Sequence, residues 1–185
     1  GRHTQIQGIF DMDLTFSEQD RAFQHDVREW LTQAWPQEMR EKQARSALGK
    51  LSKDDLVGWQ KRLAEKGWAG ANWPKEHGGG GRPGIERMVV AEEMIRVGAP
   101  IAASWIADRQ MGPSICNYGS EEQQRRFLPG MLSGETTWCI GMSEPDSGSD
   151  LASLTTSAER DGSDFIINGQ KIWTSLAAIS DYCYL

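Results

Sequence analysis

Hydrophobic positions near the start of the chain recur at the spacing of a helix. Phe23, Val27, Trp30 and Leu31 occupy positions i, i+4, i+7 and i+8, which places their side chains on one helical face. Ser17 precedes this stripe and is followed by acidic residues, a combination that favours a helix N-terminus. The pattern predicts an amphipathic helix that begins after Ser17.

A second helix is predicted after Ser52, with Leu56, Trp59 and Leu63 on its buried side and Gly67 at its end. The chain holds eight tryptophans, and each such ring buries a large area. We therefore expect six of them to anchor the core or an interface: Trp30, Trp35, Trp59, Trp68, Trp73 and Trp105.

The stretch 68–84 is rich in glycine and proline and predicts a long, turn-rich loop. Four consecutive glycines could in principle cradle a phosphate. Such loops do so mainly where a strand leads into a helix, and no strand is predicted before this one. A surface crossover loop is therefore the favoured interpretation.

Helical spacing returns in the range 85–96 and continues in a small-residue helix over 101–111. A further short helix is predicted after Ser120, ending at residues 128–130. The first of these three helices is expected to place four side chains inward: Ile85, Met88, Val89 and Met94.

The pattern changes from helical to alternating near Gly134. The stretches 136–142 and 154–175 favour strands, the second as a pair joined at Asp161-Gly162, and 181–185 favours another. The fold class predicted is therefore α+β. An all-α domain (1–133) is followed by the beginning of a β-barrel-like or β-sheet domain (134–185). A sheet of so few strands is not stable by itself. We therefore expect the second domain to be truncated at the C-terminus.

Composition excludes several classes of partner. The net charge of −6 and the absence of a Lys/Arg cluster argue against nucleic acid. The three cysteines and three histidines show neither disulfide nor metal-ligand spacing. No apolar run could span a bilayer, and the first residues do not resemble a signal peptide. We expect a soluble, cytoplasmic protein with no metal and no membrane span.

The loop 141–150, GMSEPDSGSD, concentrates small and hydroxyl-bearing residues. Gly148 would permit a backbone conformation closed to other residues, so that amides turn outward to an anion. Ser143 and Ser149 add hydroxyl donors. Glu144 and Asp150 suit an anion contact less well, and hydrogen bonds within the loop are expected of them. Alone, the loop would best be interpreted as an ordinary turn.

A second segment, 169–175, offers an indole followed by two hydroxyls. Trp173 can stack beside a planar ring system while Thr174 and Ser175 donate hydrogen bonds to its edge. The alternative is a strand tryptophan in the core of a sheet. Together, the two segments favour a site for a planar, phosphate-bearing cofactor.

Beyond these patterns, the chain resembles the N-terminal half of the acyl-CoA dehydrogenase family. The resemblance rests on the loop 141–153 and covers nearly the whole chain. It is supported by four further stretches: 73–81 (WPKEHGGGG), the Glu92-Glu93 pair, 118–135 (YGSEEQQRRFLPGMLSGE) and 168–175 (NGQKIWTS).

The resemblance implies FAD as the cofactor. It implies that Ile140, Met142 and Ser143 line the flavin ring, with Ser143 as a donor, and that Gly148 and Ser149 meet the pyrophosphate. Ser149 also matches an acyl-CoA contact.

The resemblance also implies that Trp173 packs against the flavin and that Thr174 and Ser175 follow it, with a hydroxyl near flavin N5. Asp146 and Ser147 depart from the small residues usual there, and Ser175 stands where many members carry threonine. These departures leave the loop conformation and the substrate preference open.

The implied function is FAD-dependent α,β-dehydrogenation of an acyl-CoA thioester to the trans-2-enoyl-CoA, in fatty acid or lipid metabolism. The family's glutamate base lies in a C-terminal helical domain, so no catalytic residue is assigned here, and the chain alone is expected to be inactive. Electron-transfer flavoprotein or a similar acceptor and a homo- or heterotetramer are the implied partners. A flavin oxidase or monooxygenase, and a non-catalytic subunit, remain alternatives.

Overall fold

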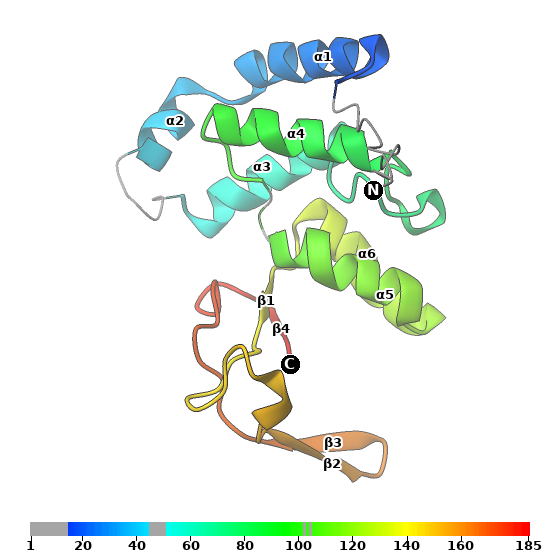
Figure 1. Ribbon diagram of the computed structural model, residues 1–185, viewed down its shortest axis with the longest axis vertical. Coiled ribbons are helices and arrows are strands. Elements are labelled where there is room, and N and C mark those ends of the chain that lie inside the picture. Colours follow the sequence, from blue (N-terminus) through cyan, green and yellow to red (C-terminus); the bar gives the residue numbers. More distant parts are fainter. Residues whose placement is uncertain (1–14, 45–50, 102, 104) are drawn as a thin grey trace, which may run out of the picture.

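A computed structural model of the chain describes residues 15–44, 51–101, 103 and 105–185. Its helices gather at one end and its strands at the other (Figure 1). The helices are α1 (Glu18–Ala34), α2 (Gln37–Ala44), α3 (Lys53–Glu65), α4 (Gly84–Arg96), α5 (Gly112–Tyr118) and α6 (Glu121–Ser133). The strands are β1 (Trp138–Ile140), β2 (Ser157–Asp161), β3 (Asp164–Asn168) and β4 (Tyr182–Tyr184). The predicted α+β class, a helical domain and then the beginning of a sheet domain, is confirmed.

Three of the helices begin with the same side-chain cap. Ser17, Ser52 and Ser120 each accept a hydrogen bond from a backbone amide of the first turn. An acidic or amide side chain three residues later bonds back to the serine amide in each case. This reciprocal capping satisfies two amides that a helix start would otherwise leave unpaired. The three helix starts predicted at Ser17, Ser52 and Ser120 are confirmed.

The core of the helical part lies between α1, α3 and α4. The predicted stripe of α1 faces it, with Val27 and Leu31 fully buried and Phe23 and Trp30 packed against them. Trp59 and Leu63 of α3 face the same core. Tryptophan rings interlock there, since the Trp35 and Trp59 centroids lie 5.0 Å apart in an edge-on arrangement.

The inward face of α4 differs from the prediction. Val89 and Met94 are buried as expected, but Met88 is 48% exposed and Val90 is buried in its place. The helix is rotated because Glu93, 1% exposed, occupies a core position. Its carboxylate binds Arg28 at 2.8 Å and Arg96 at 2.6 Å.

Glu93 also accepts a hydrogen bond of 2.8 Å from the side-chain amide of Gln24. Burial by itself raises the pKa of Glu93, but the bonds from Arg28 and Arg96 outweigh it and leave that pKa lowered. The carboxylate is therefore a structural link between α1 and α4.

The last helix continues beyond its predicted end. Helix α6 runs through Pro129 to Ser133, although proline cannot donate its helical hydrogen bond. Leu128 and Met131, on either side of Pro129, are both buried in a second cluster with Trp73 and Trp138. Packing of these side chains outweighs the missing bond. Of the predicted tryptophan anchors, Trp105 is partly exposed and lies outside both clusters.

The glycine-rich loop is closed on itself around Trp73. The amides of Gly79, Gly80 and Gly81 donate to the carbonyls of Pro74, Gly70 and Trp73. Because these amides are already paired, they are not free to cradle a phosphate. The loop contains one 3₁₀ turn, Lys75–His77, and otherwise crosses between helices as predicted.

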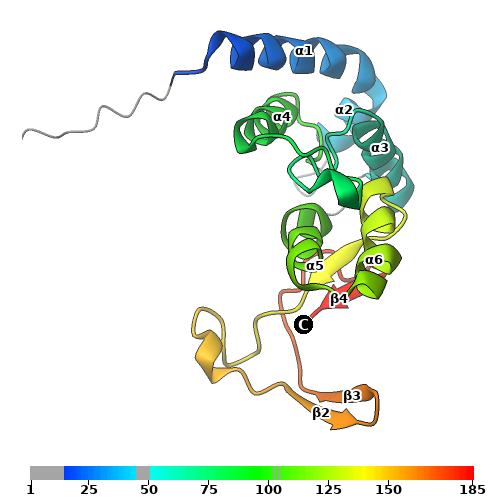
Figure 2. The same cartoon turned by 90° about the vertical axis from the view of Figure 1, so that its right-hand side faces the viewer.

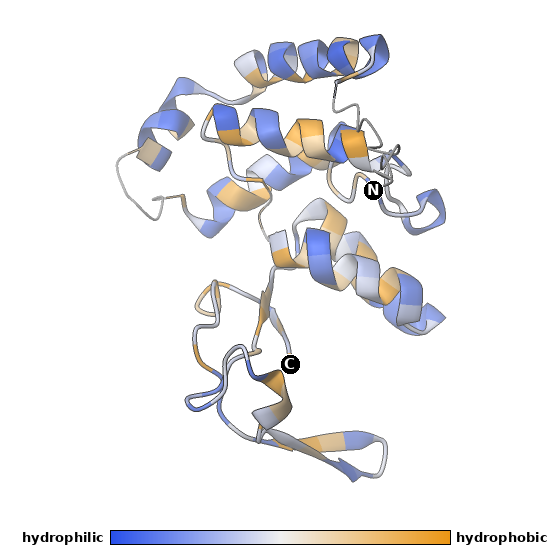
Figure 3. Ribbon diagram, viewed as in Figure 1, coloured by the Kyte–Doolittle hydropathy of each residue, from blue (hydrophilic) through white to orange (hydrophobic). Residues whose placement is uncertain are grey.

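The strands form two separate pairs. Strand β1 pairs in parallel with β4, and β2 pairs with β3 as an antiparallel hairpin. The hairpin extends from the body of the molecule (Figure 2). Its apolar residues, which colour β3 orange in Figure 3, are exposed: Phe165, Ile166 and Ile167.

Two glycines provide a matched test of packing. A Cβ at Gly112 would lie 1.7 Å from Cζ2 of the buried Trp73 ring, whereas a Cβ at Gly58, inside α3, meets nothing within 4 Å. We expect Gly112→Ala to lower the free energy of unfolding by about 1–3 kcal/mol through overpacking. Gly58→Ala should raise it by roughly 0.5–1 kcal/mol, because alanine favours helices. Urea denaturation measures both, and equal effects would contradict this account of the packing.

Candidate functional site

The structure brings the two predicted segments together. The amide of Ile172 donates to the carbonyl of Ser143 at 2.9 Å. The ammonium of Lys171 lies 3.0 Å from the Met142 carbonyl and 2.9 Å from a carboxylate oxygen of Glu144. Three polar contacts therefore join the loop 141–150 to the segment 169–175.

The two segments begin beside paired strands. The loop follows β1 directly, and the amide of Gly141 donates to the carbonyl of Tyr184 at 2.8 Å. Trp138, Cys139 and Ile140 lie opposite the three residues of β4 in parallel register. This short sheet fixes the start of the loop next to the strand that follows the second segment.

Glu144 holds the loop in shape from inside. Its carboxylate, 4% exposed, accepts the amides of Thr155 at 2.7 Å and Thr156 at 2.9 Å, and the Thr155 hydroxyl at 2.8 Å. Hydrogen bonds from Thr156 and Thr155, together with Lys171, hold the pKa of Glu144 well below its usual range. The expected hydrogen-bonding role of Glu144 within the loop is confirmed.

Asp150 has the similar role that was expected of it, because it accepts a hydrogen bond from the Ser153 hydroxyl.

Gly148 does not adopt the conformation that was expected of it. Its φ lies outside the left-handed region, and a Cβ there would meet no atom within 4 Å. The curvature comes instead from a backbone bridge in which Glu144 and Ser147 exchange two hydrogen bonds, of 2.7 and 3.1 Å. Gly148 and Ser149 are exposed on the surface of this turn.

Trp173 is not a core residue, so the alternative of a buried strand tryptophan is wrong. Its side chain is 86% exposed, and its φ of +56° is left-handed, which is strained for a residue with a side chain. Leu176, three residues later, has a φ of +68°. Strained residues persist where the surrounding structure holds them, and they concentrate at functional sites.

Hydroxyl groups near the site fall into two sets. Those of Ser147 and Thr155 are bonded within the protein, to the Ser153 carbonyl and to Glu144. The hydroxyl of Thr156 is buried without a hydrogen-bond partner. Within the described ranges, four more hydroxyls of these segments also make no hydrogen bond in the protein: those of Ser143, Ser149, Thr174 and Ser175. These are the hydroxyls that the sequence assigned to a cofactor.

Two further residues, Met142 and Ile140, were expected to line the flavin ring. Met142 is 44% exposed and Ile140 is half-buried.

A cavity of about 350 Å³ opens beside Ser175, between the helical part and the second segment. Its lining is mainly apolar and includes Leu56, Ile101, Trp105, Ser175, Leu176 and Ile179. Sequence reasoning missed this cavity, because its walls come from residues far apart in the chain. Trp105, which does not anchor either core cluster, is one of these walls.

Among the described residues, no group of three His, Cys, Asp or Glu side chains is placed to hold a metal ion. None of the described helices is both long and apolar enough to cross a membrane.

Two family models match the chain. The N-terminal domain of acyl-CoA dehydrogenase matches residues 17–135, and the middle domain of the same family matches residues 139–185. A curated relative, acyl-CoA dehydrogenase FadE26 of Mycobacterium tuberculosis, is 34% identical over 178 residues, which are 94% of this chain and 43% of that protein.

Similar solved structures support the same family. The ChsE4-ChsE5 complex from Mycobacterium tuberculosis matches with a TM-score of 0.81 at 35% identity, over 94% of this chain and 43% of the other. An acyl-CoA dehydrogenase complexed with FAD from Bacillus anthracis matches with a TM-score of 0.72 at 25% identity, over 92% of this chain and 28% of the other. The chain therefore belongs to the acyl-CoA dehydrogenase family, and it spans less than half the length of these relatives.

Replacing Glu144 tests whether it holds the loop. Glu144→Gln removes the charge and puts an NH₂ group among donors, so the amides of Thr155 and Thr156 should exchange hydrogen faster. Asp146→Asn is the matched control, because this exposed residue of the same loop makes no side-chain hydrogen bond or ion pair in the protein and should leave exchange unchanged.

The same variant has a pH signature. Because the folded-state pKa of Glu144 is lowered, its stabilisation is complete above the ordinary glutamate pKa of about 4.3 and is lost as the pH falls. The stability difference between wild type and Glu144→Gln should be constant from about pH 7 to 5 and shrink below that range. A difference that grew on acidification would contradict the assignment.

Proposed function

We propose that the protein carrying this chain is a FAD-dependent acyl-CoA dehydrogenase and that the two joined segments contact the flavin. The observation that carries the proposal is the exposed Trp173, followed by the unpaired hydroxyls of Thr174 and Ser175, in a segment that is bonded to the loop 141–150. A planar ring with polar edges would use both features. Membership of the family and the similar structure that is complexed with FAD support this choice of cofactor.

The chain's own residues would then bind and orient the flavin. Trp173 and Met142 would pack against the ring, with Ile140 behind them. Ser143 would donate to an edge of the ring, and Ser175, following Thr174, would present its hydroxyl near N5. FAD, when bound, supplies the acceptor for the hydride that leaves the β-carbon.

The exposed turn would meet the polar parts of both ligands. Gly148 and Ser149 would contact the FAD pyrophosphate, where the Ser149 hydroxyl can donate to an anionic oxygen. Ser149 would also contact the acyl-CoA. Neither Glu144 nor Asp150 competes for this position, because both carboxylates are already bonded within the loop.

Neither Glu144 nor Glu93 suits the role of the catalytic base. Glu144 is held ionised by its donors and Lys171, and Glu93 is enclosed by Arg28 and Arg96. A base must be free to accept a proton near the reacting carbon. We therefore place the base outside this chain's sequence, in keeping with the family pattern.

For the substrate, the apolar cavity beside Ser175 is the natural place for an acyl group. It adjoins the hydroxyl proposed to lie near N5, so a bound acyl chain would have its β-carbon close to the ring. The product would be the trans-2-enoyl-CoA, in fatty acid or lipid metabolism.

We further propose that the helical domain ends at residue 133 and the β domain begins at 134. The complete protein would assemble as a homo- or heterotetramer in the cytoplasm and pass electrons to electron-transfer flavoprotein or a similar acceptor. The matched ChsE4-ChsE5 complex favours a second candidate, in which this chain belongs to one subunit of a heteromeric enzyme.

Binding of FAD can be measured by quenching of its fluorescence. In the full-length protein, Trp173→Leu and Ser143→Ala should each weaken FAD binding, by roughly tenfold where one stacked ring or one strong hydrogen bond is lost. Ser163→Ala, in the exposed turn of the β2–β3 hairpin, is the matched control and should bind FAD normally. Equal affinity in all three variants would reject the proposed contacts.

Catalysis is tested by anaerobic mixing with acyl-CoA thioesters. The full-length protein, with its partner subunit where one is required, should lose its oxidised-flavin absorbance as an enoyl-CoA appears. An artificial electron acceptor should then sustain turnover. A colourless preparation that is inert toward an acyl-CoA panel would contradict the proposed function.

A further inference from the structure

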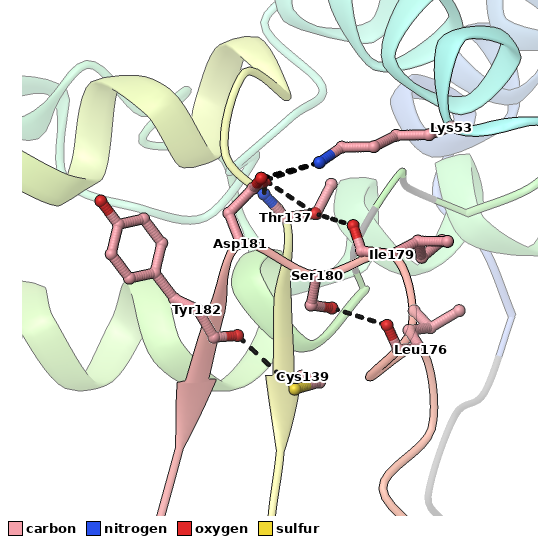
Figure 4. Close-up of polar contacts among 8 residues, drawn as sticks. All are labelled: Lys53, Thr137, Cys139, Leu176, Ile179, Ser180, Asp181 and Tyr182. Carbon is pink, nitrogen blue, oxygen red and sulfur yellow. Dashed lines mark hydrogen bonds and ion pairs between the residues drawn. The ribbon is translucent and has the colours of Figure 1, made fainter.

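The carboxylate of Asp181 connects three parts of the chain. It lies 2.8 and 2.9 Å from the ammonium of Lys53, in the first turn of α3. It also accepts the amide of Thr137 at 2.9 Å, and its Oδ2 lies 2.9 Å from the Thr137 hydroxyl (Figure 4). We call Lys53, Thr137 and Asp181 the Asp181 clamp.

The backbone strengthens the same junction. The amides of Asp181 and Tyr182 both donate to the Thr137 carbonyl, at 2.9 and 3.2 Å. The Thr137 hydroxyl also lies 2.9 Å from the carbonyl of Ile179. Thr137 directly precedes β1 and Asp181 directly precedes β4, so the clamp fixes the entrance of both paired strands.

The clamp closes one end of a strained turn. We call residues 173–176 the Trp173–Leu176 arch, because left-handed φ angles at its two ends reverse the chain around Thr174 and Ser175. At the first end, Ile172 is bonded to Ser143. At the second end, the Leu176 carbonyl accepts the amides of Ile179 and Ser180 and the Ser180 hydroxyl.

Strain of this kind is retained only where both ends are held. The second end is connected to the rest of the molecule through Asp181, which follows Ser180 directly (Figure 4). Without the bonds of the Asp181 carboxylate, the residues from Leu176 to Ser180 would keep their local bonds and the backbone bonds to Thr137, but they would lose their link to α3.

We propose that Asp181 is a positioning residue for the flavin site, which anchors the Trp173–Leu176 arch to the helical part and so holds the Ser175 hydroxyl in place. The inference rests on the proposed function, because it assumes that the arch contacts FAD. Asp181 itself touches neither ligand.

The number of donors, more than the ion pair, makes the anchor effective. Both side chains of the Lys53–Asp181 pair are more than one third exposed, and an isolated pair so exposed contributes little. Bonds from Lys53 and Thr137 nevertheless lower the pKa of Asp181 to about 2. The carboxylate is therefore ionised at neutral pH and bound on two sides.

The test compares Asp181→Asn and Lys53→Met in the full-length protein. Lys42→Met is the matched control, because Lys42 also pairs with an aspartate, Asp55 at 3.4 Å, but does not touch the arch. Hydrogen exchange of amides 176–182 is measured without flavin, and FAD affinity and the flavin absorption spectrum are measured separately.

We expect both clamp variants to exchange faster at 176–182 and to shift the flavin spectrum. FAD binding should weaken roughly tenfold in Asp181→Asn, which disturbs the bonds to Lys53 and Thr137, and roughly two- to threefold in Lys53→Met, which loses one exposed ion pair. Lys53→Arg should restore affinity. Unchanged exchange, or faster exchange with unchanged affinity and spectrum, overturns the positioning role. Because Lys53→Met leaves the carboxylate in place, it decides the question if Asp181→Asn fails to fold.

The same measurements separate the two proposals. A wild-type protein that binds no FAD overturns the proposed function, and the positioning role with it. A wild-type protein that binds FAD while the clamp variants bind it equally well overturns the positioning role alone.

Discussion

The candidate site depends on one buried carboxylate, that of Glu144. A buried charge is costly unless several donors compensate it, and Glu144 meets two amides, one hydroxyl and one ammonium. These donors come from two directions, residues 155–156 and Lys171. The electrostatic requirement of a single side chain therefore determines where both segments lie, and Trp173 follows Lys171 by two residues.

This arrangement separates the polar groups that build the site from those that remain available to a ligand. The buried Glu144 carboxylate and the groups bonded to it are inside the loop, where they fix its shape. The hydroxyls of Ser143, Thr174 and Ser175 are left on the surface beside an exposed indole. A surface prepared in this way loses little conformational freedom when a rigid ligand binds, so more of the interaction energy contributes to affinity.

Local patterns predicted the parts of the fold that local physics controls. The caps at Ser17 and Ser52 and the stripe of α1 follow from residues within one or two turns. The predictions were wrong where contacts with distant parts of the chain determine how a helix is oriented or where it ends. Met88 faces outward because Glu93 is drawn inward by Gln24 and Arg28 of α1. Helix α6 continues past Pro129 because Leu128 and Met131 pack against Trp73 and Trp138.

The same distinction applies to the site. Its residue types were recognisable in the sequence, and the joining of its two segments could be anticipated from their shared chemistry. The strained φ angles of Trp173 and Leu176 could not, because each results from bonds that the neighbouring chain makes elsewhere. Gly148, which looked like the flexible point of the loop, has ordinary backbone geometry, since the Glu144–Ser147 bridge already makes the turn.

The helical part is therefore more than a scaffold beside the site. Lys53 and Asp181 are 128 positions apart, and their contact places the end of the Trp173–Leu176 arch against α3. Leu56 of the same helix lines the cavity that Ser175 also lines. One helix thus both anchors the arch and forms a wall of the space beside it. A shift of α3 would alter the shape of the cavity and the position of the Ser175 hydroxyl together, so under the proposed function it would change acyl-group fit and flavin contact at the same time.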